Sequence, residues 1–133
     1  MTEILEQQFY VFSLSRRNND LDELLDEGFE VADITPVQSK TGGAMFRKAH
    51  GLYTNDVILL LNKTGRKTRF VHEMVIRCET SLELLEKALA KRKAEGFTAV
   101  KTIPLNAIID PEACAGIGKG TFGFAVFFSK VLD

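Results

Sequence analysis

The spacing of apolar residues switches between strand-like and helix-like periods along the chain, and it does so in the same order in both halves. Short runs of continuous or alternating apolar residues predict strands, whereas leucines that recur every three or four residues predict helices. In the first half, the pattern predicts a strand at 9–14, a helix from Leu21 to Gly28, and strands at 29–34 and 57–61. In the second half, it predicts a strand at 71–78, a helix with a stripe of Leu82, Leu85 and Leu89, and strands at 97–103 and 122–128.

Residues that begin and end secondary structure stand at the borders of these elements. Asn19 or Asp20 is placed to cap the free amide groups at the start of the first helix. Gly28 and Gly96 are placed to adopt the left-handed conformation in which helices often end. Pro36 is expected to stop the strand before it, because proline cannot donate to a strand ladder.

The two halves also repeat short motifs at a nearly fixed distance. Glu-Gly-Phe occurs at 27–29 and returns 68 residues later at 95–97. A Gly-x-x-Thr segment at 51–54 returns 67 residues later at 118–121, and Lys63 returns as Lys130. Motifs that recur in order at a fixed period predict one structural unit used twice.

The repeated order of elements predicts an α+β fold. We expect one domain over residues 1–133, built of two pseudo-symmetric βαββ halves at about 8–63 and 70–131, which form one mainly antiparallel six-stranded sheet with two helices on one face. The strands at 9–12, 57–61 and 124–128 are apolar on both faces. Because large apolar patches are rarely left exposed, this pattern favours a homo-oligomer, a dimer above all, formed through an uncovered sheet face or edge.

Composition narrows the class of protein further. The chain has 133 residues, of which 45% are hydrophobic and 26% charged, with a formal net charge of −1. A single core is therefore expected, without general attraction to nucleic acid. The acidic start of the chain and the lack of a long apolar segment predict a cytoplasmic protein that does not enter membranes. Cys78 and Cys114 are expected to be reduced thiols, with no metal site and no cofactor.

The two loops before the last strand of each half are rich in glycine and lysine. Glycines let backbone amides converge on an anion, and lysine adds positive charge, so such loops are able to hold a phosphate. Neither loop is followed by the helix that a Walker loop requires, and ordinary hairpin loops are the alternative. The predicted ligand-binding residues are Lys40, Thr41, Gly42, Gly43, Arg47, Lys48, Gly118, Lys119, Gly120 and Thr121.

Other charged groups offer little chemistry. The linker at 62–69 holds four basic residues and no acid, which attracts nucleic acid, but a solvated hairpin is the preferred interpretation. His50 and His72 have no Cys or second His at metal-ligand spacing, and neighbouring His72 and Glu73 are expected on opposite faces of a strand. No catalytic set is predicted, and an enzyme is the less favoured class.

With its repeated Glu-Gly-Phe junction, the chain resembles a group of small bacterial and phage domains that have no settled function. Their pattern is a helix ending in Glu-Gly-Trp-Glu, an alternating strand, a glycine-bearing loop and an apolar strand ending in a basic residue. Residues 21–35 with 57–63 are similar to one such unit, and 82–103 with 122–130 to a second, with Phe29 and Phe97 in place of Trp. The resemblance implies the fold and no activity.

The function predicted from the sequence is a non-enzymatic binding protein. It is expected to self-associate and to contact a protein partner through its loops and open sheet face. The alternative is a receptor or scavenger for a small phosphorylated, nucleotide-like ligand held by the glycine and lysine loops.

Overall fold

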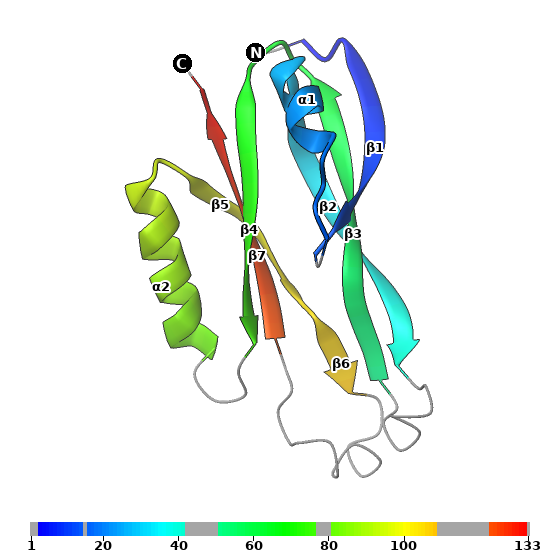
Figure 1. Ribbon diagram of the computed structural model, residues 1–133, viewed down its shortest axis with the longest axis vertical. Coiled ribbons are helices and arrows are strands. Elements are labelled where there is room, and N and C mark those ends of the chain that lie inside the picture. The colour runs from blue at the N-terminus through cyan, green and yellow to red at the C-terminus, as the bar shows by residue number, and fades with distance from the viewer. Residues whose placement is uncertain (1–2, 15, 42–50, 77–80, 109–122, 133) are drawn as a thin grey trace.

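The computed structural model describes residues 3–14, 16–41, 51–76, 81–108 and 123–132, and it confirms the α+β class. Within these residues the chain forms two helices and seven strands (Figure 1). In chain order the elements are β1 (Glu6–Ser13), α1 (Leu21–Asp26), β2 (Phe29–Thr41), β3 (Gly51–Lys63), β4 (Thr68–Ile76), α2 (Ser81–Ala94), β5 (Thr98–Pro104), β6 (Asn106–Ile108) and β7 (Gly123–Val131).

The strands form two sheets, so the expected single six-stranded sheet is wrong. The first sheet has the order β1-β3-β2, with the short β6 also paired to β3, and the second has the order β4-β7-β5. All neighbouring strands are antiparallel. Two sheets are favoured because central strands that are apolar on both faces bury more surface in stacked layers than in one open sheet.

The larger hydrophobic core lies between the two sheets. Leu59 and Leu61 of the first sheet and Phe70 and Phe127 of the second belong to one buried cluster, together with Leu25 of α1. A smaller cluster on the other face of the second sheet contains Phe97, Val126 and Phe128, against which α2 packs Leu85 and Ala88. The two helices therefore do not cover one common face: α1 belongs to the core between the sheets, and α2 covers the outer face of the second sheet.

The two halves share more than their order of elements. In each half the central strand is the last one, and the strand after the helix carries a bulge, at Ala32 in β2 and at Val100 in β5. The lysine at the end of each central strand lies over the phenylalanine of the Glu-Gly-Phe motif: Lys63 over Phe29 at 5.5 Å and Lys130 over Phe97 at 4.6 Å. These pairs explain why motif and lysine recur together, while duplication of one ancestral unit remains a prediction.

Both motif glycines adopt the left-handed conformation predicted for them. The φ angle is +100° at Gly28 and +92° at Gly96, a region that side chains make costly. Gly28 has a second role, because its carbonyl oxygen accepts hydrogen bonds from the backbone N–H groups of Thr64 and Gly65 at 2.9 and 3.0 Å. The first helix end is thereby joined to the linker between the halves.

Pro36 does not stop β2, contrary to the prediction. It pairs with Val57 inside the strand, which continues to Thr41. Since β2 is an edge strand of its sheet, one side of its backbone pairs with no other strand in the described part of the chain, and a proline there has no ladder to which it would have to donate.

The apolar stripe predicted for α2 is also wrong in part. Leu85 packs into the core, but Leu82 and Leu89 are exposed, while Leu84, Ala88 and Arg92 are partly buried. Arg92 lies on the side of α2 that faces the sheet, where it forms an ion pair with Glu73 of β4 at 2.6 Å.

Each helix is fastened to the first strand of its own half by a polar contact. The hydroxyl of Tyr10 donates to Asp20 at 2.7 Å, and burial together with this carboxylate raises the pKa of Tyr10. Asp20 does stand at the cap position of α1, but its side chain makes no capping hydrogen bond. Glu73 contacts both Lys91 and Arg92; burial raises the pKa of Glu73, and the two cations outweigh that effect, so the net shift is downward.

Candidate interaction surface

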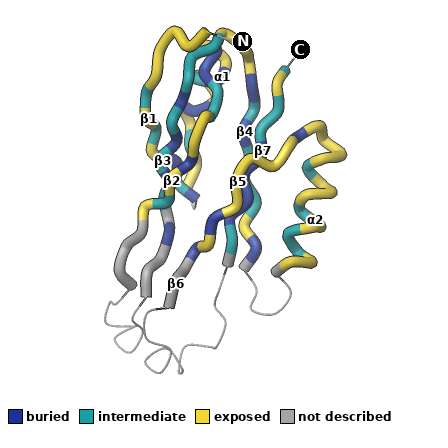
Figure 2. Tube along the Cα trace, turned by 180° about the vertical axis from the view of Figure 1, so that it is seen from behind, coloured by how far each residue is buried: buried dark blue, intermediate teal, exposed yellow. Residues whose placement is uncertain are grey.

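Among the described residues, no other layer packs against one face of the first sheet. Phe9 and Val11 of β1 point outward and are 73% and 63% exposed, next to the partly buried Leu60 and Ile58 of β3. Figure 2 shows β1 mostly in the colours of exposed and intermediate residues. We call this surface, centred on Phe9, Val11, Ile58 and Leu60, the open face.

The centre of the corresponding face of the second sheet is buried, whereas Met74, the counterpart of Val11, is 43% exposed. By register, Phe127 and Ala125 of β7 hold the positions that Leu60 and Ile58 hold in β3, and both are fully buried against the first sheet. Side chains of this face therefore serve as a packing surface in one half and remain uncovered in the other. The exposed apolar area is thus a property of the position of the first sheet in the molecule, at one end of the stack of layers.

Polar residues border the open face along the strands. At one end, the Gln7 side chain donates to Asn62 at 2.6 Å. At the other end lies Asp56, whose carboxylate takes part in no ion pair or side-chain hydrogen bond among the described residues. An apolar centre with a polar border is the usual composition of a protein interface.

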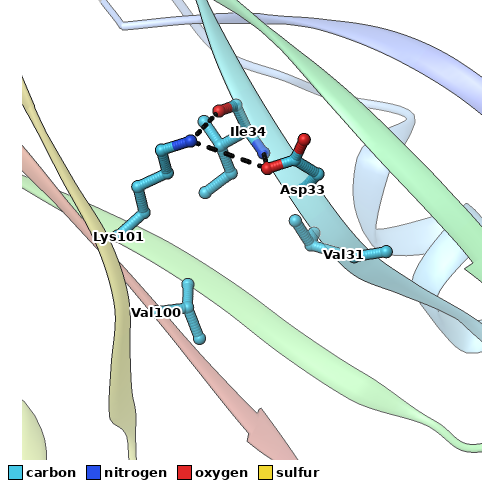
Figure 3. A pocket seen from close by; sticks show the side chains of 6 residues that line it. Val31, Asp33, Ile34, Val100 and Lys101 are labelled. Atoms are coloured by element: carbon cyan, nitrogen blue, oxygen red, sulfur yellow. Dashed lines mark hydrogen bonds and ion pairs between the residues drawn. The ribbon is translucent and has the colours of Figure 1, made fainter.

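A hydrogen-bonded junction joins β2 and β5 where their bulges meet (Figure 3). The Lys101 ammonium donates to the carbonyl oxygen of Ile34 at 2.6 Å and lies 3.6 Å from the Asp33 carboxylate. The backbone N–H of Ile34 donates to Asp33 at 2.9 Å. Because side chains satisfy its edge groups here, β2 offers little to another strand at this point. The hollow beside the junction has a volume of only about 50 Å³, too small for an organic ligand.

A wider hollow of about 240 Å³ lies between the sheets near the linker that joins the halves. Its polar lining is largely occupied: Arg66 and Glu30 form a bidentate pair, and Thr68 donates to the carbonyl oxygen of Phe29. The hydrogen bonds from Arg66 lower the pKa of Glu30, so this acid stays ionised and paired. The hollow therefore has little unpaired charge with which to select a ligand.

Two of the four basic residues in the linker are neutralised by acids from elsewhere in the chain. Arg66 pairs with Glu30 at 2.7 Å, and Arg69 pairs with Asp26 at 2.7 Å. These contacts agree with the interpretation of the linker as a solvated hairpin. They also reduce the positive charge that would attract nucleic acid.

The His72 side chain packs against the core between the sheets. Its imidazole lies between Phe12 and Phe127, with centroid distances of 5.1 and 6.1 Å, and its Nε2 is 3.2 Å from the carbonyl oxygen of Leu14. Burial lowers the pKa of His72, although the contact with Leu14 opposes this shift. As expected, Glu73 points to the opposite face, toward α2. Among the described residues, no group of three or more His, Cys, Asp and Glu residues is arranged to hold a metal ion.

The predicted phosphate-binding residues fall mainly outside the described part of the chain. Lys40 and Thr41 are the last residues of β2, and their side chains are not described. The remaining eight, Gly42, Gly43, Arg47, Lys48, Gly118, Lys119, Gly120 and Thr121, lie outside the described residues, as do His50, Cys78 and Cys114.

The strand ends that flank the two glycine and lysine loops are nevertheless neighbours. Gly51 pairs with Thr41 on one side and with Ile108 of β6 on the other. The short strand β6 was not predicted, because three residues are too few to show a period. It brings the start of the second loop beside Gly51, where the first loop ends.

The sequence indicated that some sheet face was uncovered but did not identify its residues. The signal was present at 9–12, where consecutive apolar residues must point to both faces of one strand.

Comparison with known proteins yields no relatives: no protein-family description, curated protein sequence or solved structure matches the chain. The resemblance to bacterial and phage βαββ domains therefore stays a prediction. Within the described residues, neither helix has the length and apolar character needed to cross a membrane.

Proposed function

We propose that the protein is a non-enzymatic binding module that self-associates through the open face. The observation that supports this proposal is the exposure of Phe9 and Val11 on a sheet face whose central counterparts in the second half, Phe127 and Ala125, are fully buried. A second copy of the chain is the simplest occupant, because the chain already packs a face of this kind against a sheet of its own.

The size of the open face predicts a weak dimer. Three strands spaced by about 4.8 Å, over the seven residues 7–13 at about 3.3 Å each, give a footprint of about 14 by 23 Å. This area of about 320 Å² is well below the roughly 800 Å² that each partner buries in a standard interface. Association is therefore expected to be reversible and to depend on concentration.

Sedimentation velocity over about 1 µM to 1 mM protein, which spans weak dissociation constants, tests the proposal. The wild-type chain should shift from monomer to dimer, and the double variant Phe9→Gln, Val11→Thr should require at least about tenfold more protein for the same shift, since exposed aromatic residues often dominate binding energy. Leu82→Gln is the matched control, because Leu82 of α2 is 71% exposed and lies away from the open face. A wild-type chain that stays monomeric, or equal effects of both variants, would contradict the proposal.

Recognition of a small phosphorylated ligand stays the second candidate. It is favoured by the pairing of Gly51 with both Thr41 and Ile108, which places the flanks of the two loops side by side. A ligand that binds only the folded protein raises its melting temperature. A thermal-shift panel of nucleotides should therefore give a shift that Lys40→Ala with Lys119→Ala abolishes, and an unchanged shift in that variant would remove these loops from consideration.

A further inference from the structure

The register of the first sheet determines which residues of the open face are neighbours. Along β3, the residues that point outward are, in order, Asn62, Leu60, Ile58 and Asp56. Cross-strand partners in an antiparallel sheet point to the same side, so the residues paired with these four also belong to the open face.

The two central positions of β3 have different neighbours on their two sides. Leu60 is paired with Phe9 of β1 and with Asp33 of β2. Ile58 is paired with Val11 of β1 and with Thr35 of β2. The apolar part of the open face is therefore displaced toward β1, and the side toward β2 is polar.

Two copies that meet through the same face are related by a two-fold axis in the plane of the interface. In aligned packing, the arrangement considered for this dimer, stacked sheets keep their strand directions within about 30° of each other. The axis then runs either along the strands or across them, and each choice makes a different set of contacts.

An axis along the strands exchanges β1 with β2 of the second copy. Asp56 then faces Asp56 of the second copy, and Phe9 faces Asp33 of the second copy. Like charges in direct opposition repel, and a carboxylate that is buried against an aromatic ring loses its hydration without gaining a partner. This arrangement is unfavourable at both positions.

An axis across the strands, between the Leu60 and Ile58 positions, reverses the strand direction. Phe9 then faces Val11 of the second copy, and Leu60 faces Ile58 of the second copy. Asp33, which already contacts Lys101, faces the hydroxyl of Thr35 of the second copy. Apolar residues meet apolar residues, and the one acid in this region meets a donor.

The outer positions of the central strand β3 agree with this choice, and Glu30 of β2, the register partner of Asn62, is already bonded to Thr64 and Arg66. Asp56 faces Asn62 of the second copy and Asn62 faces Asp56 of the second copy. The Asn62 side-chain oxygen already accepts from Gln7, which leaves its N–H donors without an acceptor among the described residues. A hydrogen bond from Asn62 to the unpaired Asp56 carboxylate is charge-assisted and occurs twice in a symmetric dimer.

We infer that two copies of the chain dock with their open faces antiparallel, across a two-fold axis perpendicular to the strands, with Asp56 of each copy accepting a hydrogen bond from Asn62 of the other. This inference rests on the self-association proposed above. It adds the orientation of the partner and names polar residues that select it.

The variant Asp56→Asn tests the orientation by the sign of its effect on the dimer dissociation constant. The antiparallel arrangement predicts weaker association, by about five- to tenfold for each of the two contacts, because a neutral hydrogen bond replaces a charge-assisted one. The parallel arrangement predicts tighter association, because a repulsion disappears. Asp22→Asn, at an exposed position of α1, is the control for loss of one charge and should have no effect. A tighter or unchanged dimer in Asp56→Asn overturns the inference.

Photo-cross-linking locates the contact directly. Phe9→benzoylphenylalanine protein is mixed with isotopically labelled wild-type protein and irradiated, and the labelled peptide that becomes attached is identified by mass spectrometry. Attachment to the β1 peptide supports the antiparallel arrangement, and attachment to the β2 peptide overturns it while leaving self-association through the open face intact. A dimer that gives no intermolecular cross-link, or a wild-type chain that stays monomeric, overturns both the inference and the proposed function.

Discussion

Replacing Gly28 with alanine should destabilise the protein far more than the same change at the equivalent Gly96. Both residues have left-handed backbone angles, with φ of +100° and +92°. The two positions differ in their surroundings. A Cβ at Gly28 would lie 2.8 Å from the Cα of Gly65, whereas a Cβ at Gly96 would meet its nearest atom, in the Lys130 side chain, at 3.8 Å.

The left-handed conformation alone costs an alanine about 1–2 kcal/mol. The lower entropy of the unfolded alanine chain returns about 0.4–1 kcal/mol, so Gly96→Ala should lower the free energy of unfolding by about 1 kcal/mol. Gly28→Ala adds a steric clash between the new Cβ and the backbone of Gly65, which should lower the free energy of unfolding by about 1–3 kcal/mol more. Moving Gly65 away also strains the two hydrogen bonds accepted by the Gly28 carbonyl, each worth about 0.5–1.5 kcal/mol. The expected total for Gly28→Ala is about 3–5 kcal/mol.

Urea unfolding followed by circular dichroism measures these differences in the free energy of unfolding. Gly65→Ala is the control for backbone conformation alone, because its φ is +87° and nothing lies within 4 Å of a Cβ built there. It should resemble Gly96→Ala. If Gly28→Ala and Gly96→Ala differ by less than about 0.5 kcal/mol, the close approach of Gly28 to the linker does not contribute as argued.

Further outcomes follow from single contacts. Burial lowers the pKa of His72, and Glu73 and Arg92 are its neighbouring charges. The unfolded chain therefore binds a proton more readily than the folded chain does. The contribution of His72 to the free energy of unfolding should be fully present above about pH 6.5 and should fall as the pH drops below that value. Urea unfolding at several pH values should show a slope there that His72→Gln reduces, and an equal slope in that variant would contradict the assignment. Lys101→Met should cost about 1–3 kcal/mol in the same assay, because the Ile34 carbonyl loses a charged donor, whereas Lys87→Met on α2 should be nearly neutral; equal values would remove the junction as a stabilising contact. Phe127→Ala should cost about 3–5 kcal/mol, since Phe127 is fully buried between the sheets, and a loss below about 1 kcal/mol would be inconsistent with that packing.

The local features of this fold could be predicted from residues close together in the chain. The left-handed glycines at 28 and 96 follow from helix ends, and the α+β class follows from the alternation of periods. The repeated Phe and Lys positions were visible as motifs, and the structure adds that each lysine lies over its phenylalanine. These predictions succeeded because backbone conformation and periodicity depend mainly on near neighbours.

The arrangement of these elements depended on contacts between distant residues. A strand that is apolar on both faces fits one covered sheet or two stacked sheets equally well, so the division into two sheets was not predictable from periodicity. Whether Pro36 ends a strand depends on whether that strand lies at an edge. Strand order is set by pairings with β3, such as that of Pro36 with Val57, which lies 21 residues further along the chain (57 − 36).

The open face likewise combines a part that the sequence predicts, its apolar residues, with a part that depends on contacts between distant residues, its exposure. The apolar run at 9–12 showed that some face needed a cover, because side-chain direction alternates along any strand. Which face stays open was decided by the stacking of the second sheet and α1 against the inner side of the first sheet, since burial depends on all the layers together. Phe9 and Val11 are thus recognisable as apolar strand residues from the chain alone, and as a surface available to a partner only once both sheets are in place.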